Sequence, residues 1–217
     1  MKILGIDEAG RGCVIGPLVV AGVVMSSGDL EKLNALGVRD SKRVLRAQRA
    51  RLAREIKRLA QHIIVVEIEP NELDENLTAV ELRAMGRIIW ESGAERVYLD
   101  LPVGPLARDR FQASLDVYLH QLEAGEGRQL MRSLVAENRA DAKYPIVSAA
   151  SIIAKVHRDQ AIERLHQEYG DFGWGYPGEP KTRKFLREFY ERMGRFPPCA
   201  RHKWRTLRKL SERSLDL

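Results

Sequence analysis

The sequence predicts an α/β fold: a mixed five-stranded sheet flanked by helices, followed by a helical C-terminal part. Three observations lead to this prediction. Five short apolar runs rich in β-branched residues occur before residue 137, helical patterns separate the later runs, and only helical patterns and loops follow residue 147. We expect one core over residues 1–170 and a basic helical part over residues 171–217 that packs on this core.

The first two strands are expected at residues 3–6 and 18–25, where the chain reads Ile-Leu-Gly-Ile and Leu-Val-Val-Ala-Gly-Val-Val-Met. About ten residues join the two runs, which is too short for a crossover helix, so we expect these strands to be antiparallel. Three further strands are expected at residues 63–68, 97–100 and 134–136.

Apolar residues at helical spacing predict seven helices between and after these strands. They are expected at residues 30–36, 45–60, 78–91, 111–122, 147–169, 181–193 and 203–211. The helices after the third and fourth strands serve as crossover connections, which is why the sheet is expected to be mixed. Residues 125–127, Gly-Glu-Gly, are expected to form a flexible turn.

Composition excludes several classes of protein. No apolar run approaches the roughly 18 residues of a membrane span, and we expect no signal peptide because strand-like sequence begins at Lys2. Cys13 and Cys199 provide neither a disulfide framework nor a metal-binding spacing, so we expect a cytoplasmic protein. The net charge is +6, and residues 181–209 hold 11 Lys and Arg against 2 acids. Such a stretch indicates a nucleic-acid contact or a solvated helix face, and charge alone leaves both open.

Four acids are expected to converge at one edge of the sheet. Asp7 and Glu8 close the first strand, Asp100 ends the fourth, and Asp141 starts a helix just beyond the fifth. Clustered carboxylates repel one another unless a cation lies between them, and Mg²⁺ or Mn²⁺ suits oxygen ligands. Two such ions about 3.5–4 Å apart would clamp a phosphoryl displacement. The alternative, that Asp100 and Asp141 are ordinary helix-start acids, stays open.

The turn after the first strand has the composition of a phosphate-binding site. Neighbouring residues of a strand face opposite sides, so Asp7 and Glu8 reach one site only if the strand ends or bends there. Gly10 and Gly12 permit such a bend because glycine lacks a Cβ. Arg11 between them offers a planar fork of donors that suits phosphate.

Residues 5–12, Gly-Ile-Asp-Glu-Ala-Gly-Arg-Gly, with Gly-Pro at 16–17, closely resemble the opening of type 2 ribonuclease H, the ribonuclease HII family. The resemblance continues in Asp-Ser-Lys at 40–42, Tyr-Leu-Asp at 98–100 and Ala-Asp at 140–141. It extends through Tyr-Pro-Ile-Val-Ser-Ala-Ala-Ser-Ile-Ile-Ala-Lys-Val at 144–156 and Gly-Tyr-Pro at 175–177. The Gly-Tyr-Pro-Gly-Glu-Pro loop is similar to the archaeal and eukaryotic form. Because the first strand opens the sequence, we expect no extra N-terminal domain of the kind found in type 3 enzymes.

The resemblance implies a ribonuclease H-like sheet and a metal-dependent endonuclease. Such an enzyme hydrolyses the RNA strand of RNA–DNA hybrids and cleaves 5′ of single ribonucleotides embedded in duplex DNA, leaving 3′-hydroxyl and 5′-phosphate ends. It implies that Asp7, Glu8, Asp100 and Asp141 are the catalytic residues and hold Mg²⁺ or Mn²⁺, with two ions expected. Ribonucleotide excision repair is the process that this activity would serve.

The resemblance also assigns residues to substrate binding. Backbone groups of Gly10, Arg11 and Gly12, together with Tyr176, are expected to read the 2′-hydroxyl that distinguishes RNA from DNA. Arg11 and Lys42 are expected to hold phosphates, and the basic C-terminal helices to contact the duplex backbone. The alternatives, that Lys42 is a plain surface residue and that Tyr176 only packs its loop, stay open. Cys13 stands where the family more usually has proline, from which we expect a small effect on turn rigidity.

Two other functions are compatible with parts of this pattern. A non-catalytic hybrid-binding module would lack one of the four acids, and all four are present. Another phosphoryl transferase on the same fold is disfavoured by the Gly-Arg-Gly turn with Tyr176. We expect a monomer, no membrane association and no sliding-clamp partner, because residues 211–217 contain no aromatic pair. Asp159 is open between supporting the site and a surface ion pair, and His202 has no assigned role. Ser148 and Ser151 are expected to pack helix against sheet, and the alternative that one of them orients substrate stays open.

Overall fold

The structure is a computed structural model that describes residues 1–38, 44–74, 76–127, 129 and 132–214. The chain forms two compact units. Unit 1 contains residues 1–9, 19–66 and 78–156, and unit 2 contains residues 10–18, 67–77 and 157–217. Both units therefore collect segments that are distant in sequence. The division expected at residue 170 stays a prediction.

The expected five-stranded mixed sheet is confirmed. Its strands are β1 (Lys2–Ala9), β2 (Leu18–Ser26), β3 (His62–Ile68), β4 (Arg96–Asp100) and β5 (Ser133–Glu137). Their order in the sheet is β3-β2-β1-β4-β5. Strand β1 is antiparallel to β2 and parallel to β4, which is parallel to β5. The carboxyl ends of β1, β4 and β5 therefore lie side by side.

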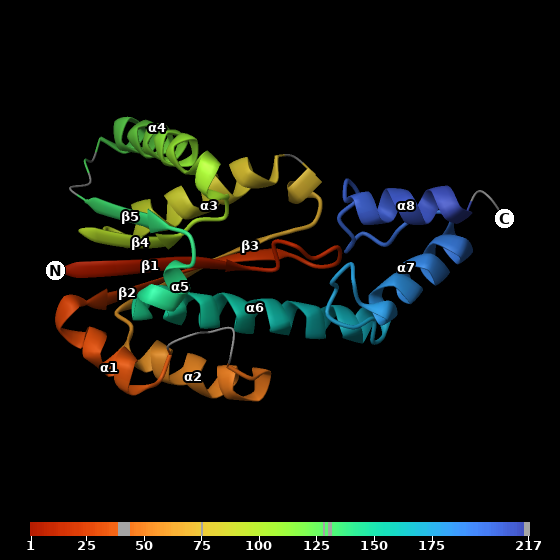
Figure 1. The fold of residues 1–217 in the computed structure, drawn as a ribbon, viewed down its shortest axis with the longest axis horizontal. Coiled ribbons are helices and arrows are strands. Elements are labelled where there is room, and N and C mark those ends of the chain that lie inside the picture. Colours follow the sequence, from red (N-terminus) through yellow and green to blue (C-terminus); the bar gives the residue numbers. More distant parts are fainter. Residues whose placement is uncertain (39–43, 75, 128, 130–131, 215–217) are drawn as a thin grey trace. The chain divides into compact units, whose positions relative to one another are not determined.

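The helices follow the predicted order. They are α1 (Leu30–Ala35), α2 (Arg46–Leu59), α3 (Leu77–Ser92), α4 (Arg108–Glu126), α5 (Ala140–Lys143), α6 (Pro145–Tyr169), α7 (Pro180–Met193) and α8 (Arg205–Ser214). In unit 1, α3 and α4 cover one face of the sheet, and α1, α2 and the first part of α6 cover the other (Figure 1). In the part of the chain that the structure describes, no helix has the length and apolar character needed to cross a membrane.

The ends of β1 and α4 lie beyond their predicted positions. Strand β1 does not end at Asp7 and Glu8 but continues to Ala9, because its pairing with β2 runs on in regular register through Glu8↔Val20 and Ala9↔Val19. The expected turn at residues 125–127 is largely helix, since α4 extends to Glu126 and ends at Gly127, whose φ of 63° gives a left-handed cap.

Close packing of α6 on β1 shapes the region around the acids. A Cβ added at Gly5 would lie 2.3 Å from the carbonyl oxygen of Ile146, in the first turn of α6. Only glycine fits at this point of β1, since any larger residue would displace the helix backbone. Val147, Ala150 and Ala154 continue the contact of α6 with the apolar core of unit 1.

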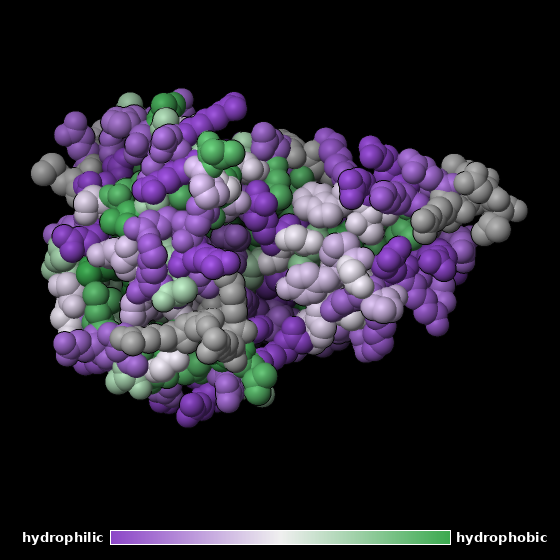
Figure 2. All heavy atoms as spheres, in the orientation of Figure 1, coloured by the Kyte–Doolittle hydropathy of each residue, from purple (hydrophilic) through white to green (hydrophobic). Residues whose placement is uncertain are grey.

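Unit 2 has its own apolar core. It contains Val14, Ile15, Ile162, Phe172, Leu186, Cys199, Ala200, Leu207 and Leu210. A bridge between Ile15 and Ala200 ties the segment after β1 to the segment before α8. Hydrophilic side chains cover α7 and α8 (Figure 2). One cation of this basic stretch does not belong to the surface, however, since Arg201 is completely buried.

Candidate functional site

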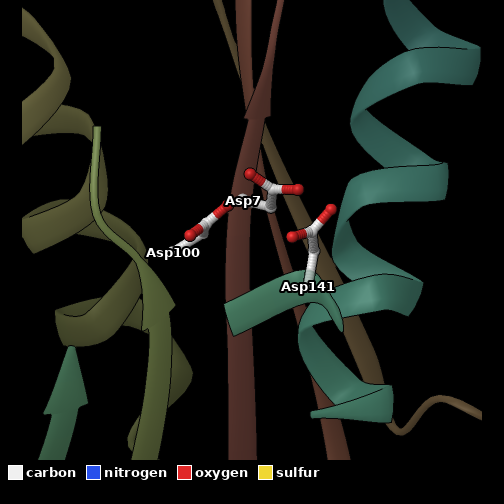
Figure 3. A group of neighbouring side chains, drawn as sticks. All are labelled: Asp7, Asp100 and Asp141. Atoms are coloured by element: carbon white, nitrogen blue, oxygen red, sulfur yellow. The ribbon is translucent and has the colours of Figure 1, made fainter. Parts of the chain in front are cut away.

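Three of the four predicted acids meet in unit 1. Asp7, Asp100 and Asp141 each offer a carboxylate oxygen, and these oxygens all lie within 4.8 Å of one another. The three side chains point toward a common centre from β1, the end of β4 and the short helix α5 (Figure 3). Asp7 and Asp141 are buried, and Asp100 is partly exposed. The convergence expected from the parallel strand ends is therefore present for these residues.

The connection from β5 to α5 places Asp141. Arg139, just before α5, has φ 60° and ψ 36°, a left-handed conformation that is uncommon outside glycine. The backbone N–H of Ala140 donates to Asp100 Oδ1 at 3.0 Å. The side chain of Asn138 donates to the carbonyl of Val103 at 2.6 Å and so ties the loops after β4 and β5 together. These contacts hold Asp100 and Asp141 in one arrangement.

The carboxyl group of Asp7 is electrostatically unfavourable in its charged form. Burial raises the pKa of Asp7 to about 7, and the negative charge of Asp100 contributes to the rise. A hydrogen bond from Ser151 acts in the opposite direction and stabilises the carboxylate. Lys155 in turn donates to Ser151 Oγ at 2.8 Å.

Ser151 and Lys155 are site residues that the sequence analysis did not identify, because Ser151 was expected mainly to pack and Lys155 was given no role. The signal that was available is their spacing of four residues, which places both side chains on one face of α6. Ser148 was also assigned to packing, and its hydroxyl donates to the carbonyl of Val38.

The three carboxylates fit a divalent cation. All the converging ligand atoms are oxygens, which hard cations such as Mg²⁺ and Mn²⁺ prefer. Burial and, to a smaller extent, the charge of Asp100 raise the pKa of Asp7, and a cation at this point would offset both effects. The three carboxylates can therefore hold a divalent cation and balance its positive charge.

Glu8 does not belong to the group of three. Because β1 continues in regular register past Asp7, the side chains of Asp7 and Glu8 leave the strand on opposite faces. The bend that would have turned both toward one site is absent from β1, so the predicted convergence of four carboxylates is reduced to three among the described residues. A ligand role of Glu8 stays a prediction.

The Gly-Arg-Gly turn is an ordered part of unit 2. The backbone N–H of Cys13 donates to the carbonyl of Gly10 at 3.1 Å, which closes a tight turn over Arg11 and Gly12. Proline at position 13 has no N–H and cannot make this bond. Gly10 has φ 90°, Arg11 is partly exposed and Gly12 is exposed. The expected bend is therefore found at Gly10, beyond the end of β1.

Tyr176 lies beside this turn within unit 2. Its side chain is 47% exposed, and its hydroxyl is hydrogen-bonded to the thiol of Cys13. The carbonyl of the preceding residue, Gly175, accepts hydrogen bonds from the N–H groups of Val14 at 2.8 Å and Ile15 at 3.3 Å. The structure thus brings together the turn and the tyrosine that were predicted to read the sugar.

The remaining predicted residues have plainer positions. Lys42 lies outside the described residues, together with the rest of the Asp-Ser-Lys segment. Asp159 is largely buried and His202 is exposed, and the role of Asp159 stays a prediction.

The chain is similar to known proteins over nearly its whole length. The family model described as Ribonuclease HII matches residues 4–207. The ribonuclease HII of Pyrococcus furiosus is 42% identical, and the alignment covers 98% of this chain and 92% of that protein.

Solved structures give the same result. The crystal structure of the ribonuclease H2 from Pyrococcus horikoshii superposes with a TM-score of 0.86 at 38% identity and covers all of both chains. The ribonuclease HII of Archaeoglobus fulgidus, 41% identical, superposes with a TM-score of 0.81 over 94% of this chain and 96% of that one.

The Archaeoglobus protein was solved in complex with the sliding clamp PCNA. The expectation that this chain has no sliding-clamp partner therefore gains no support, and residues 215–217 of the segment on which it rested lie outside the described part. The family model and the relatives match this chain over nearly its whole length. The chain belongs to the ribonuclease HII family of hydrolytic endoribonucleases.

Proposed function

We propose that this protein is a metal-dependent endoribonuclease that hydrolyses the RNA strand of RNA–DNA hybrids. We further propose that it cleaves 5′ of single ribonucleotides in duplex DNA and leaves 3′-hydroxyl and 5′-phosphate ends. The observation that carries the proposal is the convergence of Asp7, Asp100 and Asp141 within 4.8 Å, in a chain of the ribonuclease HII family.

In this proposal Asp7, Asp100 and Asp141, with Glu8 as a further ligand, hold Mg²⁺ or Mn²⁺, and two ions are proposed. When bound, such ions lower the pKa of water and stabilise the charge that develops on the leaving oxygen. Ser151 and Lys155 orient the carboxylate of Asp7 through their chain of hydrogen bonds. The N–H of Ala140 orients the carboxylate of Asp100 in the same way.

Specificity is proposed to reside in the turn and in Tyr176. The exposed Gly12 leaves the backbone accessible to a sugar, and the half-exposed ring of Tyr176 offers a stacking surface and a hydroxyl. Arg11 and Lys42 are proposed to contact phosphates. The exposed cations of α7 and α8 are proposed to contact the duplex backbone without reading sequence.

This activity would serve ribonucleotide excision repair. The monomeric state and the cytoplasmic location expected from the sequence stay predictions.

Cleavage of a labelled RNA–DNA hybrid by an Asp141→Asn variant tests the carboxylate assignment. The wild type is expected to cleave the hybrid in Mg²⁺ or Mn²⁺ and to be inactive in EDTA. The cleavage rate of the variant in Mg²⁺ is expected to be lower by a factor on the order of a thousand. Asp116→Asn is the matched control, since Asp116 is exposed on α4. Near-normal cleavage by Asp141→Asn in Mg²⁺ would remove the metal-site assignment.

A further inference from the structure

Two buried arginines lie against the turn in unit 2. Arg158, on α6, is 2% exposed, and Arg201, before α8, is fully buried. Burying a guanidinium group is costly unless hydrogen bonds compensate for the lost water. Neither side chain contributes to the charged surface proposed to contact the duplex, so the contacts that they make inside the unit carry their role.

Arg201 holds the turn at both ends. Its Nη1 donates to the carbonyl of Arg11 at 3.1 Å, and its Nε donates to the carbonyl of Gly16 at 3.0 Å. Its backbone N–H donates to the carbonyl of Val14 at 2.9 Å, and its guanidinium carbon lies 5.1 Å from the centre of the Trp204 ring. One side chain therefore fixes two carbonyl groups that are five residues apart.

Arg158 joins the turn to the tyrosine loop. Its Nη2 donates to the carbonyl of Trp174 at 2.7 Å and, more weakly, to that of Ile15 at 3.5 Å. Its guanidinium carbon lies 5.4 Å from the centre of the Tyr176 ring. A Cβ added at Gly10 would lie 2.5 Å from Nε, so the side chain of Arg158 occupies the space that glycine leaves.

These contacts determine which way the backbone donors of the turn point. In a planar trans peptide, the C=O of one residue and the N–H of the next point in opposite directions. The carbonyl of Arg11 faces Arg201, so the N–H of Gly12 points away from it. Gly12 is exposed, and nothing lies within 4 Å of a Cβ added there. The turn therefore presents a backbone donor at an open position.

We propose that Arg158 and Arg201 are positioning residues for substrate selection: they hold the backbone of residues 10–16 and the Tyr176 loop in the geometry that recognises a ribose 2′-hydroxyl. Neither residue touches the substrate in this account. The inference rests on the proposed function, because it takes the turn and Tyr176 to be the sugar-reading elements.

The test compares the affinity for two duplexes in EDTA, where the substrate stays intact. One fluorescent DNA duplex carries a single ribonucleotide and the other is the matched all-DNA duplex, and anisotropy gives a Kd for each. Arg201→Lys and Arg158→Lys keep the charge but lose the fork that reaches two carbonyls. Selectivity is the Kd for the all-DNA duplex divided by the Kd for the duplex with one ribonucleotide. In both variants we expect this ratio to fall close to one, while the Kd for the all-DNA duplex changes by less than about twofold.

Arg208→Gln is the matched control. Arg208 lies on α8 with a side chain that is 72% exposed, so its loss is expected to weaken binding of both duplexes by the same factor and to leave the ratio unchanged. Thermal melting establishes that each variant is folded at the assay temperature. Should Arg201→Lys fail to fold, Arg158→Lys decides.

A folded arginine variant that keeps the wild-type ratio would overturn the inference. Equal weakening of both duplexes would overturn it too, since that is the signature of a merely structural role. A wild-type ratio of one would instead remove the proposed reading of the 2′-hydroxyl, and the inference with it. That outcome leaves the Asp141→Asn result unaffected.

Discussion

The carboxyl group of Asp7 is buried beside that of Asp100, so its charged form is unfavourable until a cation is bound. Its pKa is raised from 3.8 to about 7, which means that the folded protein binds this proton more tightly than the unfolded chain does. In the metal-free protein, the unfavourable contribution is absent below pH 3.8 and grows as the pH rises toward 7. It reaches about 4 kcal/mol at most.

Replacing Asp7 by Asn is therefore expected to separate stability from activity. In EDTA at pH 8, the free energy of unfolding of Asp7→Asn should be about 2–4 kcal/mol larger than that of the wild type, because the variant lacks the buried charge. Denaturant unfolding at pH 5 and pH 8 measures this difference, which should shrink at pH 5. The same variant should lose turnover in Mg²⁺. Equal stability of the two proteins at pH 8 would show that Asp7 is not electrostatically strained.

Ser151 stabilises the carboxylate of Asp7, so its removal should weaken metal binding. Ser151→Ala is expected to raise the Mg²⁺ concentration for half-maximal cleavage by about tenfold, since partners of ligand residues typically have effects of this size. A Mg²⁺ titration of hybrid cleavage measures the shift. Ser148→Ala is the control, because Ser148 donates to the carbonyl of Val38 and not to an acid. The same shift in both variants would contradict the assigned role.

Residue types and their order along the chain were enough to predict Asp7, Asp100 and Asp141 as a group. Chain order could not reveal Ser151 and Lys155, because their role depends on which face of α6 meets β1. Chain order also misplaced the bend after the first strand, which lies at Gly10 and not within β1, and a ligand role of Glu8 stays a prediction.

At the scale of elements, the contact between β1 and α6 depends on the absence of a side chain at Gly5. Gly5→Ala places a methyl group against the backbone of Ile146, which cannot move without displacing α6. We expect a loss of roughly 1–3 kcal/mol in the free energy of unfolding, as for overpacking of a rigid contact. Denaturant unfolding measures this loss.

Gly125→Ala is the matched control within unit 1. Gly125 lies in the exposed last turn of α4, with nothing near an added Cβ. This change is expected to stabilise the protein by about 0.5–1 kcal/mol, because alanine favours a helix over glycine. A Gly5→Ala variant as stable as the wild type would refute the close approach of α6.

Strand pairing explains which element boundaries the sequence could predict. The apolar periodicity located the five strands and the longer helices in the correct order, but not the four-residue helix α5. The end of β1 was misplaced because two acids interrupt the apolar run, whereas hydrogen bonding to the long strand β2 continues past them. The end of α4 was misplaced because Gly125 reads as a breaker, although the helix tolerates it at an exposed position.

At the scale of the molecule, the surface cations of α7 and α8 are expected to supply affinity but no selectivity. Neutralising the exposed Arg205 and Lys209 to Gln should lower the slope of log Kd against log salt by about two, equally for all-DNA and ribonucleotide-containing duplexes. Arg87→Gln, which removes an exposed ion pair with Glu91 on α3, should leave the slope unchanged. A selective loss for one duplex would contradict this division of roles.

The division of the chain into two interleaved units could not be predicted. Residues 10–18 and 67–77 join residues 157–217 in unit 2, and only the folded chain shows this grouping. The charge count of residues 181–209 was also misleading in one respect. It included Arg201, which is buried and holds the Gly-Arg-Gly turn.

The most direct measurement uses a labelled DNA duplex that carries one ribonucleotide, incubated with Mg²⁺ and separately with Mn²⁺ beside a matched all-DNA duplex and an RNA–DNA hybrid. We expect a single cut 5′ of the ribonucleotide, with 3′-hydroxyl and 5′-phosphate ends, and no cleavage of the all-DNA duplex. Robust cutting of the all-DNA duplex would contradict the proposed specificity for ribonucleotides. Cutting of the hybrid but not of the single ribonucleotide would retain the carboxylate site and contradict the sugar-reading role of the turn and Tyr176.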